Sequence, residues 1–234
     1  MDKGEQKLNL KAVIFDLDGV ITDTAEWHFL AWSELAKSIG IHINKEFNEE
    51  LKGISRMESL ERILDMGGIA HTFTEKEKVE LAQRKNKYYV QLLTQMTPEN
   101  IFPGIRKFLE ELKKNHIKIG LASASKNAPS ILDALQITEF FQVVADPEKV
   151  AKGKPAPDIF LSAAEKLSVN PRNCVGIEDS IAGLQSIRDA GMFSIGVGTL
   201  DIMKEAGANL VLESTAELTL ERLNGMFNIH ARDY

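Results

Sequence analysis

The sequence predicts an α/β fold in which an α-helical cap domain is inserted into a parallel β-sheet core. Over the second half of the chain, short apolar runs alternate with helical segments. Such alternation builds a parallel sheet with right-handed crossovers. Residues 24–95, which follow the first apolar run, show helical patterns and no convincing strand. This block therefore indicates a cap over the strand ends.

The first strand, residues 13–15, delivers an acidic motif to its carboxyl end. Asp16 follows directly, Asp18 comes two residues later, and Gly19 permits a sharp bend. Alternate side chains of an extended segment share a face, so both carboxylates address the edge where open α/β sheets bind ligands. Two such charges require a cation or a shared proton. A solvated turn carrying two acids is the alternative.

The cap contains three helical patterns. The first ends at Gly40 and the second before Gly67, while the third begins with the capping-box pair Thr74 and Glu77. Apolar residues recur at helical spacing within each pattern.

The core elements follow in order and give a Rossmann-like arrangement. We expect strands at 117–122, 143–144, 175–177 and 194–197, and helices at 105–114, 129–135, 158–167 and 181–190. The expected domains are a flexible N-terminal tail at 1–10, a core at 11–23 and 96–234, and the cap at 24–95.

Composition excludes several classes of protein. The 234 residues carry a net charge of -6, which argues against a nucleic-acid surface. The single cysteine, Cys174, excludes an internal disulfide framework and suits a reducing cytoplasm. No apolar run is long enough for a membrane helix. We therefore expect a cytoplasmic protein that binds neither nucleic acid nor a membrane. A monomer is the expected state, although no feature of the sequence specifies it.

Two downstream stretches carry groups that suit a phosphate. Ser123 follows the second strand, where a hydroxyl and the backbone amides at a helix start are able to bind an anion. Lys154 stands beside Pro155 in a rigid turn. Each has an ordinary alternative, because Asn127 suits a helix cap and an isolated lysine is usually a solvated surface residue.

A third stretch adds acids at the same edge of the sheet. Glu178 and Asp179 follow an apolar strand and, together with Asp16, supply hard oxygen ligands for Mg²⁺. Adjacent acids at a helix start also occur simply as partners of the helix dipole.

In this order the motifs resemble those of the haloacid dehalogenase superfamily, over nearly the whole chain. The resemblance implies that Asp16 is a nucleophile that becomes phosphorylated and that Asp18 is the general acid/base. It implies that Ser123 and Lys154 hold the transferring phosphoryl group, with a cis peptide bond between Lys154 and Pro155.

The same resemblance implies a bound Mg²⁺ as cofactor. Its ligands would be Asp16, the Asp18 carbonyl and Asp179, with Glu178 nearby. Phosphoryl transfer fits such a site because it needs positioning and charge neutralisation above all.

Several stretches resemble the sugar phosphomutases of the superfamily in particular, namely 22–28, 51–56, 84–86, 123–127 and 154–158. The implied reaction interconverts β-D-glucose 1-phosphate and β-D-glucose 6-phosphate through an aspartyl phosphate and a 1,6-bisphosphate. A Mg²⁺-dependent sugar-phosphate phosphatase, in which water accepts the phosphoryl group, is the alternative. A non-enzymatic binding protein is a third class, against which the complete set of acids argues.

A mutase needs a second, distal phosphate site. Arg56 suits a bidentate grip on a phosphate, and Ser125, Lys126 and Asn127 would complete the site. His28 would orient Asp18 when the cap closes. An exposed Arg56 and a structural His28 are the alternatives. The remaining candidates for substrate contact are Trp32, which also suits the cap core, Lys52, Gly53, Ile54, Ser55 and Lys85.

Overall fold

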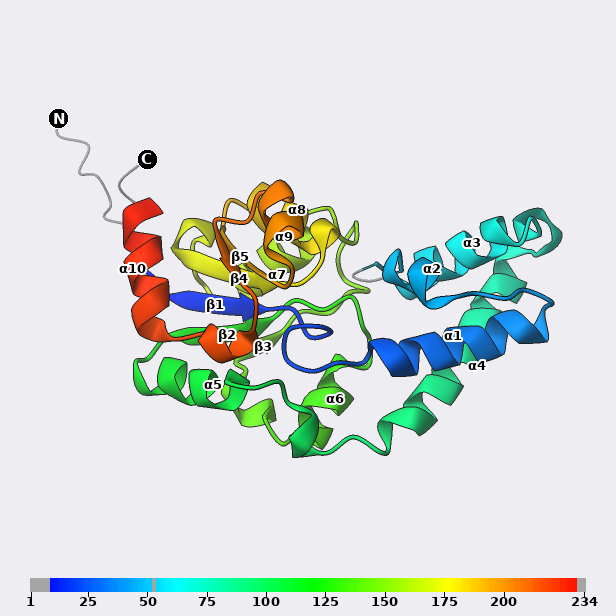
Figure 1. The fold of residues 1–234 in the computed structure, drawn as a ribbon, viewed down its shortest axis with the longest axis horizontal. Helices are drawn as coiled ribbons and strands as arrows, with labels where there is room; N and C mark the ends of the chain where they lie inside the picture. Colours follow the sequence, from blue (N-terminus) through cyan, green and yellow to red (C-terminus); the bar gives the residue numbers. More distant parts are fainter. Residues whose placement is uncertain (1–8, 52–53, 231–234) are drawn as a thin grey trace.

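The computed structural model describes residues 9–51 and 54–230. Within these ranges, six strands form a parallel sheet in the order β3-β2-β1-β4-β5-β6 (Figure 1). The strands are β1 (Ala12–Phe15), β2 (Lys118–Leu121), β3 (Val143–Val144), β4 (Cys174–Glu178), β5 (Phe193–Val197) and β6 (Leu210–Leu212). This is the order of a doubly wound, Rossmann-like sheet, whose ligand crevice lies where the strand order reverses. The predicted fold class is therefore confirmed.

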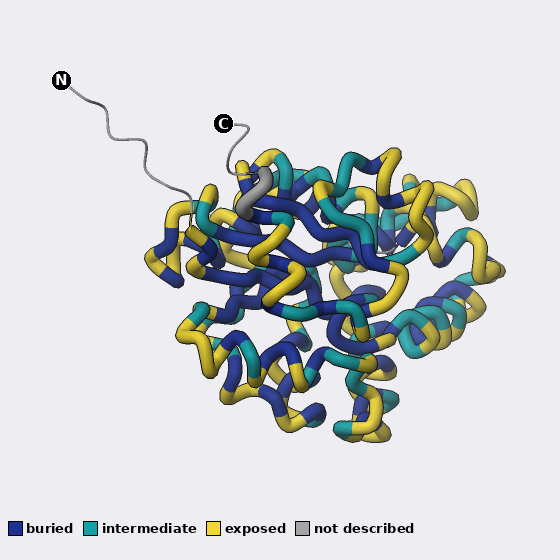
Figure 2. The backbone as a smooth tube through the Cα atoms, turned by 60° about the vertical axis from the view of Figure 1, so that its left-hand side comes forward, coloured by how far each residue is buried: buried dark blue, intermediate teal, exposed yellow. Residues whose placement is uncertain are grey.

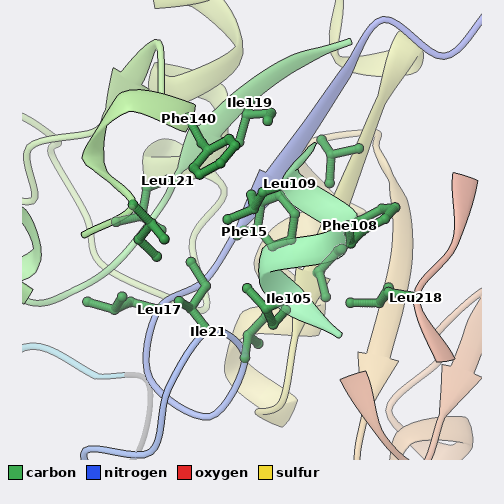
Figure 3. Close-up of a cluster of buried hydrophobic side chains, with 14 of the residues drawn as sticks. Phe15, Leu17, Ile21, Ile105, Phe108, Leu109, Ile119, Leu121, Phe140 and Leu218 are labelled. Atoms are coloured by element: carbon green, nitrogen blue, oxygen red, sulfur yellow. The ribbon is translucent and has the colours of Figure 1, made fainter. Parts of the chain in front are cut away.

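Helices cover both faces of the sheet. They are α5 (Ile105–Lys114), α6 (Ala128–Ala134), α7 (Asp158–Lys166), α8 (Ile181–Asp189), α9 (Leu200–Glu205) and α10 (Leu220–His230). Because alternate strand residues point to opposite faces, Phe15 joins the hydrophobic cluster with α5, α6 and α10, part of which Figure 3 shows. Its neighbour Ile14 joins the cluster with α7, α8 and α9. The strands thus form a buried centre surrounded by more exposed chain (Figure 2).

The cap helices lie beyond the carboxyl end of β1 (Figure 1). They are α1 (Ala25–Ser38), α2 (Lys45–Glu49), α3 (Arg56–Met66) and α4 (Glu75–Leu93). They enclose a hydrophobic cluster of their own, which includes Trp32, Leu60, Leu64 and Leu81. The domain boundaries stay a prediction, which this separate cluster supports.

Side-chain caps fix where two cap helices begin. The Thr74 N–H donates to Glu77 Oε2 at 2.7 Å, and the Glu77 N–H donates to Thr74 Oγ1 at 3.3 Å. The predicted capping box is therefore confirmed. At the start of α3, the Ser55 hydroxyl accepts from the Glu58 N–H at 3.2 Å. That cap places Arg56 on the first turn of the helix.

The predicted core elements agree closely with the observed ones, but the prediction missed α2, α9, β6 and α10. The first three are too short for a helical or strand period to stand out. Short 3₁₀ helices occur at Ala70–Thr72, Pro98–Asn100, Thr138–Phe140, Pro171–Asn173 and Thr215–Glu217. None of the helices in the described ranges is long and apolar enough to cross a bilayer.

Most of the predicted N-terminal tail, residues 1–10, lies outside the described residues. For Leu10 the prediction is wrong, because its side chain is buried in the main core cluster. Beside it, the Lys11 N–H donates to the Asn173 carbonyl at 2.9 Å. Ordered packing against the sheet therefore begins before residue 11.

Candidate active site

The first acid of the site stands at the carboxyl end of β1. Asp16 is 4% exposed, and its N–H donates to the Ile177 carbonyl of β4 at 2.9 Å. Just beyond it, Gly19 has a φ of +86°, and a Cβ there would lie 2.0 Å from Asp179 Oδ2. Any larger residue would displace that carboxylate, so the predicted bend at Gly19 is confirmed.

Lys154 bridges two of the predicted acids. Its Nζ donates to Asp16 Oδ1 at 2.5 Å and to Glu178 Oε1 at 2.6 Å. All three side chains are buried, so the interpretation of Lys154 as a solvated surface residue is wrong. The peptide bond between Lys154 and Pro155 is cis, as the family resemblance implied.

The second oxygen of Glu178 holds the start of α8. Glu178 Oε2 accepts from the N–H groups of Asp179 at 2.9 Å and Ser180 at 2.8 Å. The Ser180 hydroxyl donates to the same oxygen at 2.9 Å. A Cβ on Gly183 would lie 1.9 Å from the Glu178 carboxylate, so this glycine leaves the space that the carboxylate fills. Glu178 is therefore held rigidly by its surroundings.

Three carboxylates form a candidate metal site. Oxygen atoms of Asp16, Glu178 and Asp179 lie within 4.8 Å of one another. Burial raises the pKa of Asp16 to about 8, against the opposing charge of Lys154. Burial also lowers the pKa of Lys154, but the charges of Asp16 and Glu178 raise it overall. The ammonium thus favours an ionised Asp16, and a divalent cation among these hard oxygens would favour it further.

Asp18 has different surroundings. Its carboxylate accepts a short hydrogen bond from the Thr24 hydroxyl, next to the start of α1. Burial raises the pKa of Asp18, while the Thr24 bond and the ammonium groups of Lys154 and Lys85 oppose the rise. A carboxyl group with a raised pKa suits proton transfer near neutral pH.

Ser123 lies beside Asp16 because β2 pairs with β1. The Ala122 N–H donates to the Phe15 carbonyl at 2.8 Å, which sets the residues that follow the two strands next to each other. Ser123 is buried, and its Oγ accepts from the Ser125 N–H at 3.0 Å. The turn after β2 is therefore held by its own hydroxyl groups.

A cavity of about 530 Å³ lies between the strand ends and the cap helices. Most of the predicted site residues line it, namely Asp18, His28, Trp32, Ile54, Ser55, Arg56, Lys85, Ser125, Lys126, Asn127 and Asp179. The buried residues Asp16, Ser123, Lys154 and Glu178 do not contribute to its lining. The predicted residues Lys52 and Gly53 lie outside the described residues.

The cavity lining also combines basic and amide groups from the cap and the core. Arg56 belongs to α3, and burial lowers the pKa of its guanidinium. Lys126, in the turn before α6, forms an ion pair with Glu148. Asn127 occupies the N-cap position of α6, but its side chain makes no cap hydrogen bond, so the interpretation as a helix cap holds for its position only. Its amide instead donates to Asn86 Oδ1 of α4 at 2.8 Å.

His28 faces Lys85 across the cap wall of the cavity. Burial and the charges of Lys85 and Arg56 hold the pKa of His28 well below its usual value. Lys85 Nζ lies within hydrogen-bond distance of this ring, 2.8 Å from His28 Nδ1. Lys85 Nζ also lies 4.6 Å from the centroid of the Trp32 ring. Trp32 is thus both part of the cap core and part of the cavity wall.

The cavity residues that the sequence prediction missed include Thr24, Asn86 and Glu148, whose side chains contact predicted site residues. Thr24 and Asn86 lie within stretches that carry the sugar phosphomutase resemblance, and this signal was sufficient to find them. Glu148 follows a strand of only two residues and belongs to no motif that the sequence analysis identified.

Comparisons with known proteins agree with these observations. Residues 10–191 match the family described as haloacid dehalogenase-like hydrolase. A β-phosphoglucomutase of Bacillus subtilis is 54% identical over 92% of this chain and 94% of that protein. A phosphorylated carbohydrates phosphatase of Thermotoga maritima is 31% identical over 78% of this chain and 82% of that protein. The crystal structure of a β-phosphoglucomutase from Clostridium difficile has a TM-score of 0.92 and 51% identity, covering 94% of this chain and 98% of that one.

Proposed function

The chain belongs to the haloacid dehalogenase-like hydrolase family, and we propose that it is a phosphomutase that interconverts β-D-glucose 1-phosphate and β-D-glucose 6-phosphate. One observation above all supports this function. A single cavity is lined by Asp18 and Asp179 and also by Arg56 and Lys126, and so offers both acidic and basic groups to a sugar phosphate. The high identity to β-phosphoglucomutase over most of the chain favours the mutase over the phosphatase.

Asp16 is the proposed nucleophile. A carboxylate oxygen of Asp16 attacks phosphorus, the bond from phosphorus to the sugar oxygen breaks, and an aspartyl phosphate forms. Lys154, which contacts the Asp16 carboxylate at 2.5 Å, is placed to offset charge on the transferring phosphoryl oxygens. The Ser123 hydroxyl is the second proposed ligand of that group.

Asp18 is the proposed general acid/base. It removes the proton from the sugar hydroxyl that attacks the aspartyl phosphate, which gives the 1,6-bisphosphate. After the bisphosphate reverses its orientation, Asp18 returns a proton to the departing sugar oxygen while Asp16 accepts the other phosphoryl group. The pKa of Asp18, raised by burial, suits both directions of transfer.

Mg²⁺ is the proposed cofactor. Asp16, Asp179 and the Asp18 carbonyl would hold it, with Glu178 nearby, and the hard oxygens grouped within 4.8 Å match what this ion prefers. When bound, the ion neutralises charge on the transferring phosphoryl group. Glu178 is also placed to hold Lys154, because its Oε1 accepts from Lys154 Nζ at 2.6 Å.

Removing the metal is expected to stop turnover, because Lys154 alone would have to offset several buried carboxylates and the phosphoryl group. Treatment with EDTA should abolish activity, and added Mg²⁺ should restore it. Metal binding can also be measured independently of turnover. Added Mg²⁺ should raise the melting temperature of the metal-free wild type but not that of the Asp179→Asn variant. Full activity after exhaustive chelation would contradict the metal site.

The cap supplies the proposed sugar contacts. Lys85 and His28 form a hydrogen-bonded pair at 2.8 Å on the cavity wall, and Trp32, Ile54 and Ser55 line the same space. Lys52 and Gly53 remain candidates from the family resemblance alone. The Thr24 hydroxyl donates to Asp18 Oδ1, and His28 is the second proposed residue to orient this carboxylate, which has further acceptor sites.

The proposed working unit is a monomer. The single cysteine, Cys174, is buried, and burial raises the pKa of its thiol to about 12. We propose an enzyme of the cytoplasm on this basis. Gel filtration of the purified protein tests its oligomeric state, and a stable dimer would contradict the proposal.

The Arg56→Ala variant distinguishes a mutase function from a phosphatase function, because the two predict different effects on activity. A bisphosphate held at Asp16 has its second phosphate at Arg56 in both orientations, whereas a phosphatase leaves Arg56 without an anion. Losing a charge-assisted contact costs a few kcal/mol, and each 1.4 kcal/mol is tenfold. Mutase kcat/KM should therefore fall by roughly a hundredfold. Phosphorylation of Asp16 by acetyl phosphate, which needs only the proximal site, should change far less.

The matched control for this variant is Arg62→Ala on the same helix. Arg62 donates to Glu58 Oε1 at 3.0 Å and to the Glu50 carbonyl at 2.8 Å, and it does not line the cavity. Its loss should leave the mutase rate unchanged. Equal losses of both activities in Arg56→Ala would make Arg56 a structural residue, and no loss at all would favour the phosphatase.

A further inference from the structure

Two acids of the cavity lining have no part in the proposed reaction, Asp23 and Glu148. The Asp23 carboxylate accepts from the Ala25 N–H at 2.8 Å, at the start of α1, whereas Glu148 lies among the groups of the proposed distal phosphate site. Glu148 follows β3 and lines the cavity, and its carboxylate contacts the Lys126 ammonium. The Glu148 N–H donates to Asp146 Oδ1 at 3.0 Å, which fixes the backbone at this point. An acid among the groups proposed to bind a phosphate needs an explanation, because its carboxylate and the phosphate are both negatively charged and repel each other.

The negative charge of Glu148 also acts on Arg56 of the cap. Burial lowers the pKa of Arg56, and the Glu148 carboxylate is the strongest influence that raises it. Arg56 comes from α3 and Lys126 from the turn before α6. One carboxylate therefore acts on two cations that the chain brings together from separate elements.

We propose that Glu148 is a resident counter-anion of the distal phosphate site, which a ligand phosphate must displace from Lys126 in order to bind. The proposal rests on the proposed function, because it takes Arg56 and Lys126 as the distal site. Without a ligand, Glu148 offsets the repulsion between these cations. A bound phosphate carries more charge and more acceptor oxygens than a carboxylate, and takes its place.

This exchange lets Glu148 set the occupancy of the distal site. It weakens the binding of every anion at the distal site by a similar factor. Inorganic phosphate makes only the contacts of that site, whereas a sugar phosphate also makes contacts along the cavity. Glu148 therefore leaves the ratio of the two affinities unchanged, but it raises the concentration at which inorganic phosphate, the weaker ligand, occupies the site. It also assists release when the bisphosphate must leave the site and reverse.

The test is calorimetric titration in an Asp16→Asn background, which prevents turnover. Two probes are used, β-glucose 1,6-bisphosphate, which must fill the distal site, and inorganic phosphate. Adding Glu148→Gln should tighten the binding of both by about fivefold, which corresponds to about 1 kcal/mol for an exposed ion pair. The ion pair is exposed on both sides, with 47% of the Lys126 side chain and 61% of the Glu148 side chain accessible.

Two further variants in the same background make the result specific. Glu165→Gln removes the same charge from an exposed position of α7 away from the cavity, and should leave both affinities unchanged. In a Lys126→Met protein, Glu148→Gln should change them by less than twofold, because the ion pair is already absent.

Unchanged or weaker binding of both probes in Glu148→Gln would overturn the proposal. An equal effect with and without Lys126 would also overturn it, since Glu148 would then act only as a general charge. If inorganic phosphate binds more tightly and the bisphosphate does not bind at all, Glu148 keeps its role and the proposed sugar substrate is wrong.

Discussion

Asp16→Asn is expected to abolish both the phosphoenzyme and turnover. The buried Asp16 carboxylate contacts Lys154 Nζ at 2.5 Å, at the end of β1 where the sheet fixes its backbone. An amide keeps the shape but is a poor nucleophile toward phosphorus. Wild-type enzyme treated with a phosphoryl donor should carry a phosphate that hydroxylamine removes, as an acyl phosphate does. The variant should carry none.

The matched control is Asp133→Asn, the same chemical change at an exposed position of α6. It should form the phosphoenzyme and turn over like the wild type. A labile phosphate on Asp16→Asn, together with normal turnover, would assign the nucleophile to another residue. Asp18 would be the first alternative, because it follows the same strand end.

Asp18→Asn is expected to lower kcat by about 10² to 10⁴ while leaving ligand binding nearly intact. General acid/base assistance typically contributes a factor of this size, and the backbone carbonyl proposed to bind Mg²⁺ remains. Affinities for Mg²⁺ and the sugar phosphate are measured beside kcat. Losses of metal affinity as large as the loss of rate would contradict the division of roles between Asp16 and Asp18.

The pH profile adds a second readout for Asp18. Burial raises the pKa of its carboxyl group, and the group must be ionised to remove a proton from the sugar hydroxyl. Activity should therefore fall, as the pH decreases, at a pH above the ordinary aspartate pKa of about 4. The Asp16 nucleophile must also be ionised and its pKa is raised to about 8, so in Asp18→Asn the fall should change in position or steepness, and the part that remains reports on Asp16. A wild-type profile that is flat down to pH 4 would contradict the assignment.

The core of the site was predictable from sequence because strand ends define it. The apolar residues of β1 and β4 predict buried parallel strands, and residues that follow such strands must meet at one edge of the sheet. Asp16 and Glu178 are brought together in this way, since β1 pairs with β4. Lys154 has no such signal of its own, and only the family resemblance placed it with them.

The contacts around the distal part of the site could not be predicted, because they join segments that are distant in the sequence. The Lys126 ammonium contacts Glu148, 22 residues later, and the Asn127 amide reaches Asn86 on a cap helix. No local pattern reports such pairs. Likewise, Leu10 was placed in a flexible tail because the residues before it are polar, although its own side chain packs in the core.

The measurement that tests the proposed function most directly is the interconversion itself. Purified enzyme receives β-glucose 1-phosphate, Mg²⁺ and a trace of β-glucose 1,6-bisphosphate, and glucose 6-phosphate is followed with a coupled dehydrogenase while free phosphate is measured in parallel. We expect one glucose 6-phosphate for nearly every substrate consumed, with little free phosphate. Release of free phosphate in step with substrate loss, without glucose 6-phosphate, would show a phosphatase and contradict the mutase.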